Sequence, residues 1–151
     1  MNTPDPPFTD PGDPTRDGLA QLLGIEPVEW GGGRSELALV VDERHLRNMP
    51  ILHGGVLATL LDSALGVAAS SVAPAGRLTV TAQLNVNFIR PAFPGERLLA
   101  VGEVRHSGRQ SVVAFGEVRN EGNELVATAS GTFLFTDMPN AADSSSPTES
   151  P

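Results

Sequence analysis

A long apolar segment in the middle of the chain carries a single formally charged side chain. The segment opens with His53 and two adjacent glycines, continues through leucine, valine and alanine residues, and ends near Ser71, with Asp62 at its centre. Its apolar residues cover most of the circumference of a helix, a pattern typical of a helix that is buried inside a fold. We therefore predict a buried helix from Gly54 or Gly55 to about Ser71, around which the rest of the chain must fold.

The carboxylate of Asp62 needs an explanation, because a buried charge is unfavourable unless it is paired or hydrogen-bonded. Two interpretations are open. In the first, Asp62 bonds Ser63 or a backbone group and only stabilises the fold. In the second, Asp62 is a general base or a nucleophile in an apolar cleft. The glycines favour the second, because the N–H groups of a helix N-terminus are unpaired and a ligand oxygen can approach them closely at Gly54 and Gly55.

The catalytic interpretation predicts a homodimer. Backbone N–H groups at the helix N-terminus can stabilise a developing oxyanion, but eight residues separate Gly54 from Asp62, which is about 12 Å of helix. Asp62 of one subunit would therefore have to meet Gly54 of another, with the site at the subunit interface. A sheet wrapped around one helix also has edges that a second copy would cover.

Composition narrows the chemistry and the partners. The length of 151 residues fits one domain. The absence of cysteine excludes a thiolate nucleophile, and the three scattered histidines lack the spacing of metal ligands, so we expect no metal. All ten basic residues are arginines and form no basic stripe, so we expect no nucleic-acid partner. Because no signal peptide or apolar run of transmembrane length is visible, we expect a cytoplasmic protein that does not bind a membrane.

The net charge of −8 belongs mostly to the two ends of the chain. Residues 1–17 carry four aspartates against one arginine, and residues 137–151 carry two aspartates and one glutamate. We predict that the proline-rich residues 1–16 form a disordered arm and that residues 137–151 form a disordered tail. The folded domain is predicted over residues 17–136.

Hydrophobic alternation predicts six strands around the helix. They are expected at residues 25–30, 34–41, 77–90, 97–106, 110–119 and 124–135. A short helix is predicted from Asp17, its N-cap, to Gly24, its stop signal. Turn residues between the last three strands indicate hairpins. We expect neighbouring strands to pair antiparallel, the last four of them as a meander.

The strand predicted at residues 77–90 has the most regular pattern. Its apolar residues alternate with polar ones without interruption, and we expect all of them on the face that packs on the helix: Leu78, Val80, Ala82, Leu84, Val86 and Phe88. A strand of this length should bend. The sequence therefore predicts an α+β fold in which a curved antiparallel sheet wraps around one long central helix.

Two motifs of the chain resemble those of a known family. The first is His53-Gly54-Gly55 with Asp62 nine residues after the histidine. The second is Asn85-Val86-Asn87-Phe88-Ile89-Arg90-Pro91-Ala92, followed by Gly95-Glu96. Over residues 18–136 the chain resembles the hotdog-fold acyl-CoA thioesterases, in particular their phenylacetate-pathway and 4-hydroxybenzoyl-CoA (Arthrobacter-type) branch. The resemblance implies the hotdog fold and hydrolysis of an acyl-coenzyme A, with no cofactor because coenzyme A is part of the substrate.

The resemblance also assigns roles to residues of the first motif. It implies that Asp62 activates water or attacks the thioester carbonyl, and that the Gly54 N–H of the facing subunit, next to Gly55, polarises that carbonyl. His53 would shape the entrance of the helix. Thr81 corresponds to a hydroxyl that can hold the water in relatives, and an ordinary strand threonine is the alternative explanation. Relatives are commonly dimers of dimers, so we expect a homotetramer.

One position departs from the family pattern. Relatives often have an asparagine six residues before the histidine, where this chain has Arg47, and Asn48 lies one position later. Either residue could supply the polar group near the carboxylate. The candidates for contacts with the substrate are Arg47, Arg90, Arg105 and Arg109, as cations for the coenzyme A phosphates, and Phe88 for the acyl pocket. Ordinary surface arginines and a core aromatic residue explain them too.

Two other functions are compatible with the same fold, because a fold does not determine a function. A non-catalytic acyl-CoA-binding or sensor module would bind acyl-CoA without hydrolysis. A hydratase or dehydratase would need a catalytic histidine within the helix region, whereas His53 precedes the glycines. Both aryl and aliphatic acyl groups remain open as substrates.

Overall fold

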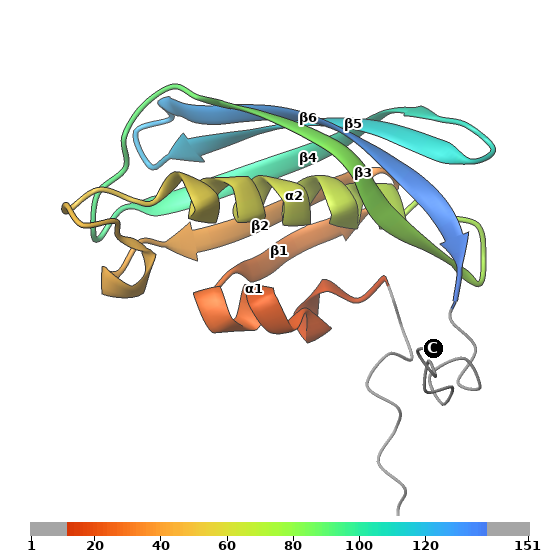
Figure 1. Cartoon of the computed structure of the whole chain (residues 1–151), viewed down its shortest axis with the longest axis horizontal. Coiled ribbons are helices and arrows are strands. Elements are labelled where there is room, and N and C mark those ends of the chain that lie inside the picture. The colour runs from red at the N-terminus through yellow and green to blue at the C-terminus, as the bar shows by residue number, and fades with distance from the viewer. Residues whose placement is uncertain (1–11, 139–151) are drawn as a thin grey trace, which may run out of the picture.

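A six-stranded antiparallel sheet curves around one long helix in the computed structural model, which describes residues 12–138 (Figure 1). The elements in chain order are η1 (Pro14–Arg16), α1 (Gly18–Leu23), β1 (Glu26–Gly31), β2 (Arg34–Val40), η2 (Glu43–His45), α2 (Gly54–Ser70), β3 (Arg77–Phe88), β4 (Arg97–Ser107), β5 (Ser111–Asn120) and β6 (Leu125–Asp137). The strand order in the sheet is β1-β2-β4-β5-β6-β3. The predicted α+β fold, a curved antiparallel sheet around one long central helix, is confirmed.

The expected pairing of consecutive strands is wrong on both sides of β3, because β3 lies beside neither β2 nor β4. β3 pairs with β6, and β4 pairs with β2, so β3 and β4 are not neighbours in the sheet. The physical reason is the length of the connections. Short turns join β4 to β5 and β5 to β6, as predicted, whereas residues 89–96 form a longer link that carries the chain from the edge strand β3 to the middle of the sheet.

The described residues before β1 are more regular than the sequence indicates. Residues 14–16 form one turn of 3-10 helix in which Pro14 is buried, although a disordered arm was expected through residue 16. The short helix α1 begins and ends as predicted. Asp17 caps it by accepting hydrogen bonds from two backbone N–H groups, and Gly24 ends it in the left-handed conformation at φ 71°. The rest of the predicted arm, residues 1–11, and residues 139–151 of the predicted tail lie outside the described residues.

The uninterrupted alternation predicted for β3 is also wrong. The pairing of β3 with β6 shifts register between Thr81 and Gln83, which is the signature of a β-bulge. Before the shift, Thr79 and Thr81 point to α2, and after it Leu84 and Val86 pack against the core.

Two apolar residues of β3 consequently face away from the helix. Leu78 and Val80 alternate with the threonines that bond α2, so they lie on the opposite face of the strand, and Val80 is 45% exposed. Ala82, at the shift itself, is exposed as well. Because of the bulge, three side chains expected in the core lie outside it, and the hydroxyl groups of Thr79 and Thr81 point at α2 instead.

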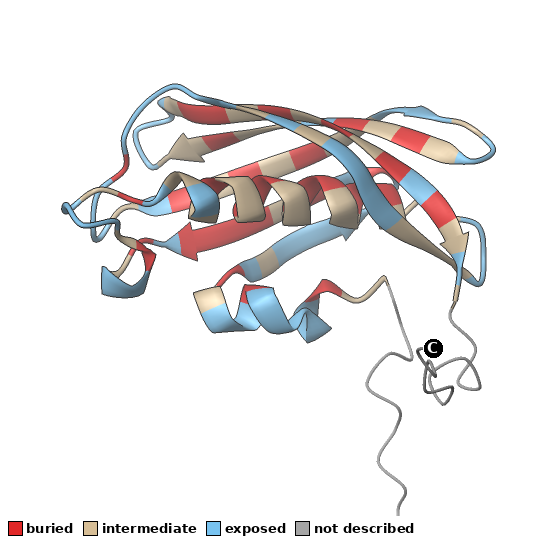
Figure 2. Ribbon diagram, viewed as in Figure 1, coloured by how far each residue is buried: buried red, intermediate tan, exposed pale blue. Residues whose placement is uncertain are grey.

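Helix α2 is buried on one side only, which corrects the expectation of a helix covered all round. Figure 2 shows buried residues alternating with intermediate ones along the helix. The buried side consists of Leu57, Leu60, Leu61, Ala64, Leu65, Ala68 and Ala69. The other side, which includes Asp62, is only partly covered within a single chain.

Glycines on the sheet allow α2 to approach it closely. A Cβ atom built on Gly102 of β4 would lie 2.5 Å from the carbonyl oxygen of Ala64, and one built on Gly131 of β6 would lie 3.2 Å from the Leu65 side chain. The backbone of α2 thus lies almost directly on the strands, with no layer of side chains between them at Gly102.

We expect Gly102→Ala to lower the free energy of unfolding by about 2–3 kcal/mol, because the new methyl group would overlap backbone atoms that cannot rotate away. Denaturant-induced unfolding measures the change. Gly18→Ala is the matched control, since a Cβ atom on Gly18 has no neighbour within 4 Å. A Gly102→Ala protein as stable as this control would contradict the close packing of α2.

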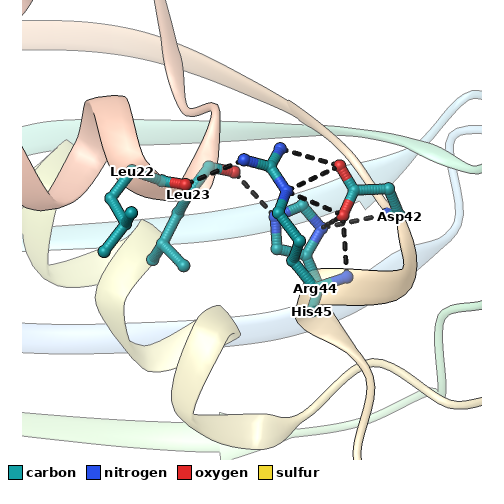
Figure 3. Close-up of polar contacts among 5 residues, drawn as sticks. All are labelled: Leu22, Leu23, Asp42, Arg44 and His45. Atoms are coloured by element: carbon teal, nitrogen blue, oxygen red, sulfur yellow. Dashed lines mark hydrogen bonds and ion pairs between the residues drawn. The ribbon is translucent and has the colours of Figure 1, made fainter.

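A buried histidine joins α1 to the segment that precedes α2 (Figure 3). His45 is fully buried; its Nδ1 accepts the Asp42 N–H at 2.9 Å, and its Nε2–H donates to the Leu23 carbonyl at 2.7 Å. Arg44 pairs with the Asp42 carboxylate at 2.7 Å and donates to the Leu22 carbonyl at 2.9 Å. Both ring nitrogens of His45 have a partner within the chain, so this histidine has a structural role.

Asp42 predicts an acid-dependent loss of stability. The hydrogen bond from the Arg44 guanidinium lowers the pKa of Asp42 to about 2, below the value of about 3.9 for an unfolded chain. The contribution of the carboxylate is therefore complete above about pH 4 and is lost as the pH falls towards 2. We expect the Tm of the wild type to fall more steeply over this range than that of Asp42→Asn. Parallel Tm curves for the two proteins would contradict the prediction.

No helix among residues 12–138 is both long enough and apolar enough to cross a membrane.

Candidate active site

Asp62 lies on the partly covered side of α2 and points at β3. Its Oδ1 accepts a hydrogen bond of 2.9 Å from the Thr81 hydroxyl, and among residues 12–138 no other side chain bonds to it. Asp62 is of intermediate exposure, so its carboxylate is not sealed in the core as expected. The hydrogen bond to Oδ1 orients the carboxylate, and Oδ2 remains open to a ligand.

The bulge in β3 brings Thr81 to Asp62. With strict alternation, the face of Leu84 and Val86 would also carry Val80 and Ala82, and Thr81 would point away from α2. The register shift between Thr81 and Gln83 reverses this for the first half of the strand. The hydroxyl of Thr81 therefore contacts the Asp62 carboxylate, where strict alternation would place an aliphatic side chain.

The N-terminus of α2 has one engaged and one open glycine N–H group. His53 is the N-cap, and its Nδ1 accepts the Gly55 N–H at 2.8 Å. The Gly54 N–H has no acceptor among the described residues. A Cβ atom built on Gly54 would lie 3.4 Å from the ring of Phe88, which is 57% exposed. Gly54 is therefore the free donor of the pair, beside an exposed aromatic ring.

The cap predicts a difference between two substitutions of His53. His53→Ala removes the acceptor for the Gly55 N–H, and we expect it to lower the free energy of unfolding by about 1 kcal/mol. Asparagine is a preferred N-cap, so we expect His53→Asn to keep most of the stability. Chemical denaturation of both variants at neutral pH measures the two changes. Equal losses in both variants would show that the imidazole acts by packing and not as a cap.

The two positions considered for the polar helper lie in the exposed loop before α2. Neither the Arg47 nor the Asn48 side chain forms a hydrogen bond or ion pair with another described residue. The loop is closed by a backbone bond from the Arg47 N–H to the Ile51 carbonyl at 3.1 Å. Both residues thus remain candidates for the polar group near the carboxylate.

The four candidate arginines for coenzyme A do not form one cluster within the chain. Arg90 donates to the Leu125 carbonyl at 3.2 Å, and Arg109 is exposed in the turn between β4 and β5. Arg105 lies 3.3 Å from Glu103, and both line a groove on the sheet face opposite α2. A joint role for these arginines therefore stays a prediction for the assembled protein.

A second pair of polar side chains, which no sequence pattern singled out, connects the same two elements. The hydroxyl oxygens of Ser70 on α2 and Thr79 on β3 lie 2.6 Å apart and are partly buried. On the helix, the sequence did offer a signal. Ser70 lies eight residues after Asp62, which is two intervals of four, so the two side chains lie on the same side of α2. The partner on β3 could not be predicted, because it depends on the bulge.

No group of three or more histidine, cysteine, aspartate or glutamate side chains in the described part of the chain could hold a metal ion. The candidate site instead consists of a carboxylate with a hydroxyl partner, and a helix N-terminus with one open N–H group. Eight residues of α2, about 12 Å, separate the two, so they do not converge within one chain.

Comparisons with known proteins find the same architecture and related sequences. The profile of the Thioesterase superfamily matches residues 49–127. The Acyl-coenzyme A thioesterase PaaI of Escherichia coli is 33% identical over 64% of this chain and 67% of its own length. The conserved protein PA5202 of Pseudomonas aeruginosa is 35% identical and has a TM-score of 0.75, with 80% of this chain and 94% of that chain covered.

A further solved structure contains a ligand. The protein smu.793 of Streptococcus mutans, determined bound to acetyl CoA, is 28% identical with a TM-score of 0.70 and covers 77% of this chain and 91% of its own. The narrower 4-hydroxybenzoyl-CoA (Arthrobacter-type) branch is not among these matches and stays a prediction.

Proposed function

The chain belongs to the thioesterase superfamily, and from this premise we propose that it hydrolyses an acyl-coenzyme A to a free acid and coenzyme A. The observation that carries the proposal is the carboxylate of Asp62, held by Thr81 on the open side of α2. The E. coli relative named as an acyl-CoA thioesterase and the S. mutans structure bound to acetyl CoA support the reaction and the class of substrate.

In the proposed reaction, the thioester carbonyl lies between Asp62 of one subunit and Gly54 of its partner. As a general base, Asp62 removes a proton from a water molecule while the water oxygen attacks the carbonyl carbon. The Gly54 N–H donates to the resulting oxyanion. The C–S bond then breaks, and the proton passes to the departing thiolate, which gives the acid and free coenzyme A. As a nucleophile, Asp62 would attack the carbon itself, and water would hydrolyse the resulting anhydride.

The two edges of the sheet support a dimer through β3. β3 is twelve residues long and pairs only with β6 within the described chain. The other edge strand, β1, contains Pro27 and a register shift between Pro27 and Glu29, both of which hinder pairing with another chain. We therefore place the twofold axis at β3, where the open side of α2 and Asp62 would face the partner subunit.

A second contact between such dimers would give the expected homotetramer. The sheet face opposite α2 carries a groove of about 460 Å³, with Phe115, Glu103 and Arg105 in its lining. Phe115 is 46% exposed, and opposite charges lie side by side in the groove. Around a twofold axis, the acidic residue of one copy can meet the basic residue of the other. We propose this face as the contact of a second dimer.

The experiment that tests the proposed function measures free thiol released from a panel of aryl, short-chain and long-chain acyl-CoAs. Release of coenzyme A with turnover is the expected result, and the panel ranks the acyl groups. Binding of an acyl-CoA without release on any member would contradict the proposal. That outcome would favour the non-catalytic acyl-CoA-binding module instead.

A further inference from the structure

We propose that the buried His45 positions the N–H group of Gly54, the oxyanion donor of the proposed reaction. This inference rests on the proposed thioesterase function and adds a positioning residue to its site. The side chain of His45 is fully buried, and the proposed reaction does not use it for proton transfer. His45 does not touch the substrate; it acts through His53, the N-cap of α2.

His45 anchors the segment that precedes α2. Among residues 42–51 it alone is buried, and residues 47–50 are exposed. Both nitrogens of its ring are engaged: the Asp42 N–H donates to Nδ1 at 2.9 Å, and Nε2 lies 2.7 Å from the Leu23 carbonyl oxygen at the end of α1 (Figure 3). The ring therefore has one orientation, and it fixes the backbone of His45 relative to the rest of the fold.

The carbonyl group of His45 holds the N-cap in turn. It accepts the His53 N–H at 2.8 Å, and the loop between the two residues closes through a bridge between Leu46 and Leu52. The Nδ1 atom of His53 accepts the Gly55 N–H at 2.8 Å. Hydrogen bonds thus connect the buried ring of His45 to the first turn of α2.

The direction of the Gly54 N–H depends on these contacts because a peptide group is planar. The carbonyl of His53 and the N–H of Gly54 belong to one peptide group, and that carbonyl accepts the Val56 N–H at 3.0 Å. This plane can turn only if the backbone of His53 turns, and the bond to His45 restrains that backbone. Since an oxyanion donor must point to the place where charge develops, the restraint acts on catalysis.

Leu52 is a second anchor of this segment and does not replace His45. Its side chain is 4% exposed, and its N–H donates to the Ala92 carbonyl at 2.9 Å. That bond holds the residue before the cap, whereas the bond from His53 to the His45 carbonyl holds the peptide group next to that of Gly54. We therefore expect a protein without the His45 imidazole to keep α2 in place and to lose the precise direction of the donor.

Substitutions of His45 test this inference through kcat and KM measured separately. His45→Phe keeps a ring and removes both ring bonds, and we expect kcat to fall about ten- to a hundredfold, the effect of a misplaced catalytic group. KM should stay unchanged, because the donor acts on the transition state. His45→Gln is the conservative variant, since glutamine at the third position of a helix can accept the N-cap N–H. Its kcat should lie within a few-fold of the wild type.

Arg44→Ala is the matched control within the same network. Arg44 donates to the Leu22 carbonyl and pairs with Asp42, so it also joins α1 to the segment before α2, but it does not bond the His45 ring. We expect the kcat of Arg44→Ala to equal that of the wild type.

A double-variant cycle separates positioning from a general loss of structure. If His45 acts through the Gly54 N–H, His45→Phe causes no further loss of kcat in the Gly54→Pro protein, which has no such N–H. The same fold loss in both backgrounds would overturn the inference, and so would an unchanged kcat in His45→Phe at a temperature below its Tm. If His45→Phe does not fold, His45→Asn takes its place under the same criteria, because it keeps an acceptor for the Asp42 N–H and is shorter towards the Leu23 carbonyl.

Failure of the proposed function gives a different result. A wild type that releases no thiol from any acyl-CoA of the panel would overturn that function before any variant of His45 is compared. A wild type that turns over, together with an unaffected His45→Phe protein, would overturn the positioning role alone.

Discussion

Asp62→Asn is expected to reduce kcat about a thousandfold while leaving the fold intact. The amide cannot remove a proton from water or attack a thioester, and loss of a general base typically costs about two to four orders of magnitude. The amide oxygen can still accept the Thr81 hydroxyl proton, so the contact between α2 and β3 is preserved. Free thiol release with the best acyl-CoA of the panel measures the loss.

The matched control for this variant is Asp42→Asn. It makes the same chemical change at a carboxylate in the segment before α2 whose side chain is 45% exposed and is paired with Arg44. We expect its turnover at neutral pH to equal that of the wild type. Unreduced turnover in Asp62→Asn would remove Asp62 from the chemistry and leave the Thr81 contact as a structural bond.

Gly54→Pro is expected to reduce kcat about a hundred- to a thousandfold, the typical effect of removing one donor from an oxyanion hole. Proline deletes the one N–H group at this end of α2 that has no acceptor in the described chain. It is tolerated at the first residue of a helix, which Gly54 is. His53 already has the extended conformation (φ −67°, ψ 132°) that a residue before proline prefers. Turnover and Tm are measured together.

Gly54→Ala separates the loss of the N–H group from the addition of atoms. It keeps the donor, and its Cβ atom meets the Phe88 ring at an ordinary distance of 3.4 Å. We expect turnover within a few-fold of the wild type. If Gly54→Ala and Gly54→Pro lost activity equally at unchanged Tm, the explanation would be crowding beside Phe88, and Gly54 would not be the oxyanion donor.

Local patterns in the sequence predicted both α-helices and all six strands, but neither the 3-10 turns η1 and η2 nor the assembly of the sheet. Alternation and turn residues placed the six strands within a few residues, and Asp17 and Gly24 marked the ends of α1, because these features depend on neighbours in the chain. The partner of β3 depends on how the chain crosses the sheet after α2. No residue of the link between β3 and β4 specifies that β3 becomes the edge beside β6.

The bulge in β3 shows most clearly what a sequence pattern leaves out. The apolar residues from Leu78 to Phe88 alternate without interruption, yet the strand shifts register after Thr81. The gain comes from Asp62 and Ser70, whose polar groups find hydroxyl partners on the strand. Asp62 and Ser70 lie on another element, 19 and 9 residues before the threonines, so the pattern of β3 alone favoured an aliphatic face.

Some residues of the candidate site stood out in the sequence. The glycines and Asp62 stood out because each is unusual for a buried helix, and the structure adds that His53 engages the Gly55 N–H and leaves that of Gly54 open. The half-covered α2 could not be predicted, since apolar residues on all sides do not tell whether the same chain or a second copy covers them.

Mixing two inactive proteins tests the central claim, that each site takes Asp62 from one subunit and the Gly54 N–H from another. The Asp62→Asn and Gly54→Pro proteins are unfolded together, refolded as a mixture and assayed for thiol release. In a hybrid dimer, one site combines both defects and the other has neither. Since random pairing makes about half of the dimers hybrid, we predict recovery of about a quarter of wild-type activity. No recovery, with hybrid dimers demonstrated by mass spectrometry, would contradict a site shared between subunits.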